Sequence, residues 1–314
     1  MAQATGALSK LVMGFESVFK TPPSDGFIMP INSSSLKGSR NQITPATITG
    51  NINPVEPFDG NMSVSGEVAV PVDSIAFWYW LKAAFGDPVT TGTGPYVHTF
   101  KAGNARPSLT LEHQFTNLAV PRFFRYVGCK INGLSISAGD DGELVANFSV
   151  VGTSETIENS AFDTAPSAAG FSRLKNNQLT LKEGGSTISN AKLVDCSINF
   201  NIDTDQYVIG GGGIVGALPE GVMTITGNLN ALFENTTLLE KAIDSTESSL
   251  EATFEASSTS KLVIKYPEVK YTRNSPSIDG PKGIAIALPF GAYYTNASEA
   301  TSVVVTLTNS EEHA

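Results

Sequence analysis

The stretch GNMSVSGEVAV, residues 60–70, recurs later in the chain, without a gap, as GVMTITGNLNA, residues 221–231. The two glycines and the methionine are identical, and several other positions exchange Ser for Thr or one aliphatic residue for another. A match of this length between two parts of one chain indicates a tandem duplication of a structural unit.

The residues that follow each copy strengthen this interpretation, because both copies lead into a helix-like stretch and then a strand-like one. A capping residue precedes each predicted helix, since Asp and Asn side chains accept hydrogen bonds from the free N–H groups of a first turn. In the first copy these features are Asp73, Ile75–Phe85 and Ser108–Phe115, and in the second they are Asn235, Leu238–Ile243 and Ser249–Glu255.

Within both copies apolar and polar residues alternate strictly, which is typical of a strand with one face on a core and one on water. The apolar positions, expected to point into the units, are Met62, Val64, Val68, Val70, Met223, Ile225, Leu229 and Ala231. The intervening positions, expected on the open face, include Ser63, Ser65, Glu67, Thr224, Thr226 and Asn228. The sequence therefore predicts a one-sided sheet in each unit.

The composition of the 314 residues favours a mainly β protein with cores of ordinary size, since 41% are hydrophobic and only 16% are charged. The formal net charge of −10 argues against a protein that grips nucleic acid. The sequence contains neither an apolar run of membrane-spanning length nor a recognisable secretory signal. We therefore expect no membrane association and folding in a cytoplasm.

The predicted organisation is two tandem units, each a β-sandwich or barrel with one flanking α-helix. Residues 1–155 form the first unit with its N-terminal arm, 156–175 a linker, and 176–314 the second unit. Further strands are expected in both units, whereas residues 87–106 look like a loop. The predicted strands are Arg122–Gly128, Lys130–Ser137, Leu144–Gly152, Lys261–Tyr266, Val269–Thr272 and Ile284–Ala292.

No catalytic, cofactor or metal site is predicted. The three histidines, His98, His113 and His313, are far apart and lack metal-ligand spacing. The segment from Asp203 begins like a calcium loop but lacks its third ligand and its glycine. The cysteines, Cys129 and Cys196, lie in strand-like runs and are expected to be buried reduced thiols. The sequence does not predict an enzyme.

Several stretches together resemble the bacteriophage tail tube proteins (major tail proteins) of the long-tailed phages. They are the opening Gly14–Pro22, the strand region Met29–Leu36, the strand Asp59–Val70, a helix ending in Phe85-Gly86-Asp87, and His98-Thr99-Phe100 leading to Pro107–Glu112. The resemblance covers residues 10–155 best, and the second half matches chiefly through the internal repeat.

The resemblance implies a structural subunit of the virion tail, made in the host cytoplasm. Such units form rings, the rings stack into a tube, and the inner sheets join into one barrel around a channel for DNA. The family further implies a tail terminator, a tape measure and distal tail proteins as partners. Family members commonly place six single units in a ring, so two fused units per chain predict a ring of three chains with approximate sixfold symmetry.

The distribution of charge favours the channel independently of the resemblance. No Lys or Arg occurs between Arg40 and Lys82 or between Lys192 and Lys241, the two windows that contain the repeated strands. A surface built to bind DNA would carry cations there. We therefore expect DNA to pass the polar face without specific binding. Two alternatives remain at this stage: another self-assembling β-rich virion protein, such as a capsid decoration or fibre module, and an enzyme or ligand-binding β-barrel.

Overall fold

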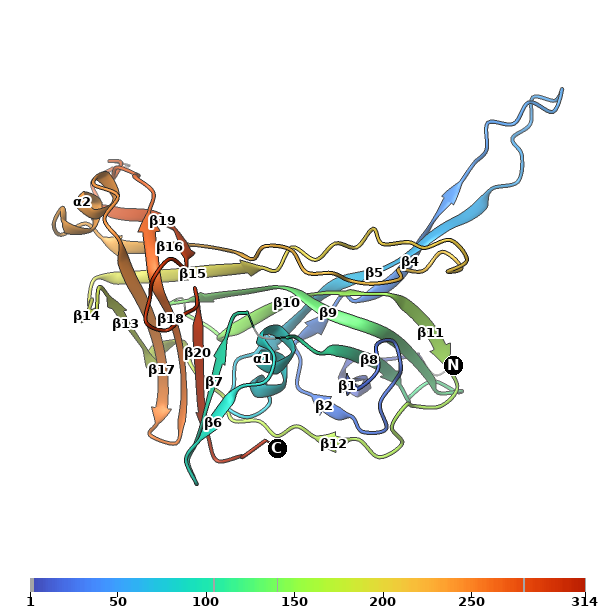
Figure 1. The fold of residues 1–314 in the computed structure, drawn as a ribbon, viewed down its shortest axis with the longest axis horizontal. Helices are drawn as coiled ribbons and strands as arrows, with labels where there is room; N and C mark the ends of the chain where they lie inside the picture. Colours follow the sequence, from blue (N-terminus) through green and yellow to red (C-terminus); the bar gives the residue numbers. More distant parts are fainter. Residues whose placement is uncertain (1–2, 104, 140, 279, 314) are drawn as a thin grey trace.

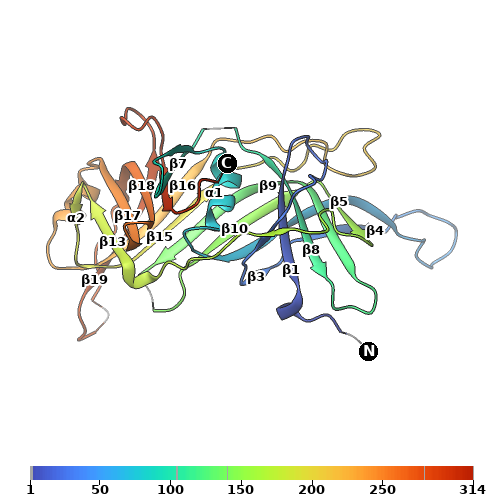
Figure 2. The same ribbon diagram turned by 90° about the horizontal axis from the view of Figure 1, so that it is seen from below.

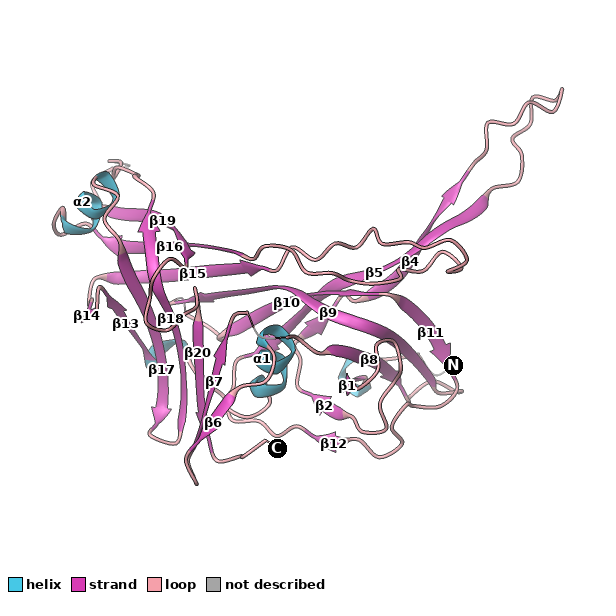
Figure 3. Cartoon of the chain, viewed as in Figure 1, coloured by secondary structure: helices cyan, strands magenta, loops and turns pink. Residues whose placement is uncertain are grey.

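The computed structural model describes residues 3–103, 105–139, 141–278 and 280–313 (Figure 1). The described chain is mainly β, with two α-helices, α1 (Phe77–Phe85) and α2 (Thr237–Ile243), as the sequence predicts (Figure 3). Among the residues described, no helix has both the length and the apolar character needed to cross a membrane.

The strands fall into two series that repeat along the chain. The first series is β1 (Lys10–Glu16), β2 (Phe27–Met29), β3 (Ser33–Ser34), β4 (Lys37–Ile43), β5 (Phe58–Pro71), β6 (Val89–Thr91), β7 (Tyr96–Lys101), β8 (Ser108–Phe115), β9 (Arg122–Ala138), β10 (Val145–Gly152), β11 (Ser154–Glu158) and β12 (Ser167–Ala168). The second series is β13 (Leu179–Glu183), β14 (Ser186–Thr187), β15 (Ala191–Asn199), β16 (Thr224–Leu232), β17 (Ser248–Ser257), β18 (Ser260–Tyr271), β19 (Ala285–Tyr293) and β20 (Val304–Asn309).

One antiparallel sheet, here called the common sheet, runs through both units. Its strand order is β4–β5–β10–β9–β15–β16–β19–β18, with β3 continuing the line of β4. The junction between the units is the pairing of β9 with β15, which places Ser135 opposite Ser197. The two units are therefore joined by backbone hydrogen bonds within a single sheet, and not only by the chain that connects them.

Each unit has a second, outer sheet that packs against the common sheet (Figure 2). In the first unit its order is β12–β2–β1–β8–β9–β11, and in the second it is β14–β13–β17–β18–β20–β7–β6. The long strands β9 and β18 belong to both sheets of their unit. This arrangement gives each unit the predicted sandwich.

The helix α1 packs on the core side of the common sheet, where the rings of Trp80 and Phe148 stack with centroids 4.8 Å apart. The Asp73 carboxylate accepts hydrogen bonds from the N–H groups of Ile75 and Ala76, at 2.6 and 2.7 Å, in the turn that leads into α1. Asp73 thus accepts free N–H groups as predicted, but in the turn before the helix, because α1 begins later than predicted, at Phe77 with Ala76 as its cap residue.

The duplication is visible at the level of single residue pairs. Val68 of β5 lies opposite Phe148 of β10, and Leu229 of β16 lies opposite Leu288 of β19 at the equivalent place. In the first unit the Tyr126 hydroxyl donates to the carbonyl oxygen of Leu36. In the second, Tyr266 and Cys196 occupy the same two positions.

Some local predictions are wrong. Residues 87–106, expected as a loop, contain β6 and β7, and the N-terminal arm contains the buried strand β1. Arg122–Gly128 and Lys130–Ser137, expected as two strands, form the single strand β9, which bends at Gly128, where φ is +58°. Lys261–Tyr266 and Val269–Thr272 are likewise the single strand β18. The segment 156–175, predicted as the linker, contains the end of β11 and the short strand β12, which pairs with β2 of the first unit; the division of the chain into units stays a prediction.

Candidate functional site

The repeated strands β5 and β16 present the alternation that the sequence predicts. Of the expected open-face residues, Ser63, Ser65, Glu67, Thr224 and Thr226 are exposed, and Asn228 is half-buried. Of the expected core residues, Val64, Val68, Val70, Ile225, Leu229 and Ala231 are buried, and Met62 and Met223 are half-buried against the core. The common sheet therefore has a polar face, here called the open face. That it lines a channel is a prediction.

Neighbouring strands continue the open face with side chains that the sequence analysis did not identify. Residues directly opposite in an antiparallel pair project on the same side of the sheet. Following the pairings from β5 to β18 gives one row across both units: Ala69, Asn147, Ser135, Ser197, Thr226, Gly291 and Lys270. The alternation of Ser135 with Ser137, and of Asp195 with Ser197 and Asn199, was the available sequence signal.

The charges of the open face are few and of both signs. Glu67 lies opposite Ser149, and Asp195 accepts a hydrogen bond from the Asn228 amide at 3.1 Å. Cations also reach this face, because Lys37 lies opposite Ser65 and Lys270 opposite Gly291. Both lysines come from strands outside the two windows that lack basic residues. The windows therefore describe β5, β16 and the part of β15 after Lys192, but not the whole face.

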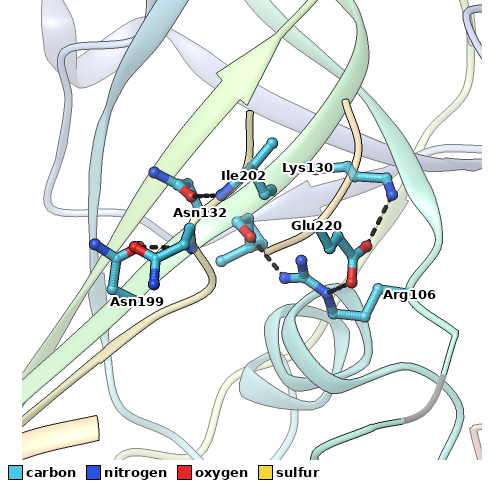
Figure 4. Close-up of polar contacts among 8 residues, drawn as sticks. Arg106, Lys130, Asn132, Asn199, Ile202 and Glu220 are labelled. Atoms are coloured by element: carbon cyan, nitrogen blue, oxygen red, sulfur yellow. Dashed lines mark hydrogen bonds and ion pairs between the residues drawn. The ribbon is translucent and has the colours of Figure 1, made fainter. Parts of the chain in front are cut away.

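A long connection between β15 and β16, residues 200–223, folds back over the first unit and is here called the second arm (Figure 1). Glu220 of this arm lies 2.9 Å from Nε of Arg106 and 2.8 Å from Nζ of Lys130 (Figure 4). Partial burial by itself would raise the pKa of the Glu220 carboxyl group, but the hydrogen bonds from Lys130 and Arg106 outweigh it and lower this pKa. The base of the second arm is thus held by a charged cluster at the junction of the units.

The tip of the second arm reaches the first repeated strand. The N–H of Met62 donates to the Gly213 carbonyl oxygen at 2.7 Å, and the Tyr207 hydroxyl donates to the Met62 carbonyl oxygen at 3.0 Å. Residues Gly210–Gly213 form the turn that allows this approach, with φ positive at Gly210, Gly212 and Gly213. The Asp203 carboxylate binds Gln206 and the backbone N–H of Asp205.

The common sheet ends in two different edges. On the first-unit side, the β3–β4 edge (residues 33–39), the Gly38 N–H donates to the Glu155 carboxylate at 2.5 Å. The Tyr126 hydroxyl donates to the Leu36 carbonyl oxygen of the same edge at 3.1 Å. On the second-unit side, residues 272–276 follow β18 along β19, and here they are called the β18 edge. Thr272, Arg273, Asn274 and Ser275 of this edge are exposed.

The cysteines and histidines have structural surroundings. Both cysteines are free and buried, as predicted, and burial raises the pKa of the Cys196 thiol to about 12. Burial lowers the pKa of His113 to about 4. The His98 ring lies within hydrogen-bond distance of Thr90 and Asn309. In the described part of the chain, no group of three or more His, Cys, Asp or Glu side chains is placed to hold a metal ion.

Comparison with known proteins identifies the architecture. A search of curated proteins returns no match. The family model described as phage tail tube protein matches residues 6–292, which is nearly the whole chain and includes both repeated strands. The chain therefore belongs to the phage tail tube protein family, a family of structural proteins of the virion tail rather than of enzymes.

Proposed function

We propose that this protein self-assembles into stacked rings that form the hollow tail tube through which DNA is delivered into the host cell. The observation that carries the proposal is the common sheet, which has a packed core on one side and, on the other, an open face made mostly of small and polar residues. A sheet of this kind is stable in water on its open side only if that side stays solvated. A wide aqueous channel provides that environment.

The ring of this proposal contains three chains and has approximate sixfold symmetry. Each chain supplies two equivalent units, residues 1–155 and 176–314, connected by 156–175. Its two sheet edges differ, since one is the β3–β4 edge and the other is the β18 edge. Subunits that carry two different complementary edges close into a ring when the rotation between them divides a full turn.

The open face is proposed to line the channel, with Ser63, Ser65, Glu67, Thr224, Thr226 and Asn228 among the lining residues. Serine, threonine and asparagine hydrate well and offer phosphate no fixed charge, so DNA has few places to adhere. Specific DNA binding would require a concentration of cations on this face. A tail terminator, a tape measure protein and distal tail proteins are the proposed partners at the tube ends and in the lumen.

Electron microscopy of the purified protein tests the proposal. We expect hollow tubes or rings in negative stain, and a reconstruction with three chains in each ring. Six chains per ring would contradict the proposed stoichiometry while leaving the tube intact. Isolated particles that never associate, at concentrations where other tube proteins polymerise, would contradict the function itself.

A further inference from the structure

We infer that the contact between neighbouring chains repeats the contact between the two units of one chain, in the same strand register and with Asp59 and Lys270 in place of Glu220 and Lys130. This inference rests on the proposed ring. The partner is a second copy of this chain, and the argument comes from the junction that the structure already contains.

The internal junction has two parts. The first is the ladder between β9 and β15, which places Gly133 opposite Asn199 and Ser135 opposite Ser197. The second is the ion pair between Lys130 of β9 and Glu220 of the second arm, with a separation of 2.8 Å. Both parts lie where the first unit meets the second (Figure 4).

The strands on each side of this junction have equivalents at the two ends of the common sheet. The strand β15 corresponds to β3 and β4, because Ser197 lies opposite Thr226 as Lys37 lies opposite Ser65 in the other copy. The strand β9 corresponds to β18 and the β18 edge. Tyr126 lies opposite Leu111 in the first unit, and Tyr266 lies opposite Leu250 in the second.

Transfer of the internal register to these equivalents gives the register between chains. It places Ser39 of one chain opposite Arg273 of the next, and Lys37 opposite Ser275. The equivalent internal pairs are Gly133 with Asn199 and Ser135 with Ser197. The Phe200 N–H donates to the Asn132 carbonyl oxygen, and hydrogen-bonded pairs alternate with non-hydrogen-bonded pairs along an antiparallel ladder, so both of these internal pairs are non-hydrogen-bonded. Pro276 falls opposite Leu36 and has no N–H to donate. The Leu36 carbonyl oxygen already accepts a hydrogen bond from the Tyr126 hydroxyl, so it keeps a donor in the proposed contact.

The ion pair transfers in the same way. Asp59 directly precedes Gly60 as Glu220 precedes Gly221, its equivalent in the repeat. Lys130 lies opposite Val151 of β10, and Lys270 lies opposite Gly291, the equivalent position of β19. The duplication has therefore kept one acidic and one basic residue at the two places where the junction requires them.

Asp59 and Lys270 cannot form this pair within one chain. Asp59 lies in β5 and Lys270 in β18, at opposite ends of the common sheet (Figure 1). Both side chains are exposed, and within the described residues neither has an ion-pair partner in its own chain. A second copy of the chain, rotated about the tube axis, brings the acidic end of one sheet to the basic end of the next.

Charge reversal tests the ion pair. We expect Asp59→Lys and Lys270→Glu each to raise the protein concentration needed for tube formation by roughly tenfold, since each places like charges together. The double variant restores opposite charges and should return to within about twofold of the wild-type concentration. An exposed ion pair contributes little free energy, so exchanging its two partners should change the threshold only slightly. Asp244→Lys, which reverses an exposed carboxylate at the end of α2, is the matched control and should leave the threshold unchanged.

Cysteine cross-linking tests the register. Opposed residues that lie between hydrogen-bonded pairs of an antiparallel ladder have Cα atoms close enough for a disulfide. Chains with Lys37→Cys and Ser275→Cys should form covalent dimers and trimers when assembled tubes are oxidised. Lys37→Cys combined with Arg273→Cys, offset by two residues, should not cross-link.

The outcomes separate this inference from the proposed function. If the wild-type protein forms tubes but the double charge-reversal variant does not recover, the inference is wrong and the proposed function is unaffected. The same conclusion follows if only the offset cysteine pair cross-links. Failure of the wild-type protein to form tubes under any condition would overturn the proposed function instead.

Discussion

The hydroxyl of Tyr266 lies 2.7 Å from the Sγ atom of Cys196, and this contact ties the outer sheet of the second unit to the common sheet. In the first unit, Tyr126 makes the equivalent contact with the backbone of Leu36, at 3.1 Å. The position of the tyrosine has been kept while its acceptor has changed. The reason is visible in the strands, because the Leu36 carbonyl lies on an open sheet edge whereas the Cys196 backbone is paired with β9.

The tyrosine contacts predict unequal losses of stability. Tyr266→Phe should lower the free energy of unfolding by about 1 kcal/mol, because the thiol is a weak acceptor that loses little when its partner is removed. Tyr126→Phe should cost more, about 1.5 kcal/mol, since a backbone carbonyl loses its donor. Urea unfolding of both variants checks this order, and an equal loss in the two variants would contradict it.

The contact of Glu155 with the β3–β4 edge predicts an effect on the protein concentration at which tubes form. The Glu155 carboxylate occupies the Gly38 N–H of the β3–β4 edge, where the proposed neighbouring chain would supply a carbonyl oxygen. Side chains that cover a sheet edge protect a free chain from indiscriminate pairing. Glu155→Ala should therefore lower the concentration needed for tube formation by roughly fivefold, the equivalent of a net hydrogen bond of about 1 kcal/mol.

The control for this prediction is Glu155→Gln, which keeps an acceptor oxygen at the edge and should behave nearly as the wild type does. Light scattering on freshly purified protein measures the threshold and the lag. Slower assembly of the alanine variant would show that Glu155 is itself part of the contact between chains.

The open face predicts that two substitutions are tolerated in folding but not in delivery. Ser65 and Glu67 are exposed, so replacing both with Lys should change the free energy of unfolding by less than about 0.5 kcal/mol. In assembled particles the added cations should slow DNA ejection by attraction to phosphate, more at low salt than at high salt.

The matched control is the replacement of Ser65 and Glu67 with Gln, which introduces long polar side chains at both positions, as lysine does, but without cations. DNA release from particles at two salt concentrations provides the measurement. Loss of folded protein in the lysine variant would mean that these residues face the core, and ejection that does not depend on salt would remove them from the channel.

Asp73 predicts a pH dependence of stability. Burial raises its pKa to about 6 from 3.8, despite the hydrogen bonds from Ile75 and Ala76. Because the folded state holds this proton more tightly than the unfolded state, the group favours folding most below pH 3.8, and this contribution is lost as pH rises to about 6.

Asp73→Asn keeps an acceptor oxygen but removes the titration. The free energy of unfolding of this variant, relative to the wild type, should therefore rise between pH 4 and pH 7, by at most about 3 kcal/mol. Urea unfolding at both values measures the difference. A constant difference across this range would show that Asp73 titrates normally in the folded chain.

The parts of the fold that the sequence predicts best are those controlled by local pattern. The alternation in 60–70 and 221–231 identifies β5 and β16 and assigns their faces, because a shift by one residue would bury Ser63 and expose Val64. Strand β7 shows the opposite case. Residues 96–101 include several β-forming residues, but the neighbouring strand β6 is short. The partner that pairs along the whole of β7 is β20, about two hundred residues away, which the local pattern does not reveal.

Only part of the open face was predicted, again because the missing part depends on residues distant in the sequence. Its serines on β9 and its Lys270 on β18 belong to long strands that bend from one sheet into another, and the residue at which a strand changes sheets depends on partners elsewhere. The equivalence of Asp59 with Glu220 was readable from the repeat. Its meaning was not, because the ion pair of Glu220 with Lys130 appears only once β9 and β15 are side by side.

The pairing of β20 with both β18 and β7 has a consequence for synthesis of the protein. The ribosome releases β7 together with the first unit, long before β20. The outer sheet of the second unit is therefore completed only when β20, residues 304–309, pairs with β18 on one side and with β7 on the other. Domains usually fold in the order in which they emerge. In this protein the two units cannot be completed one after the other. We expect that a chain interrupted before residue 304 lacks a complete outer sheet in the second unit and is not incorporated into the growing tail.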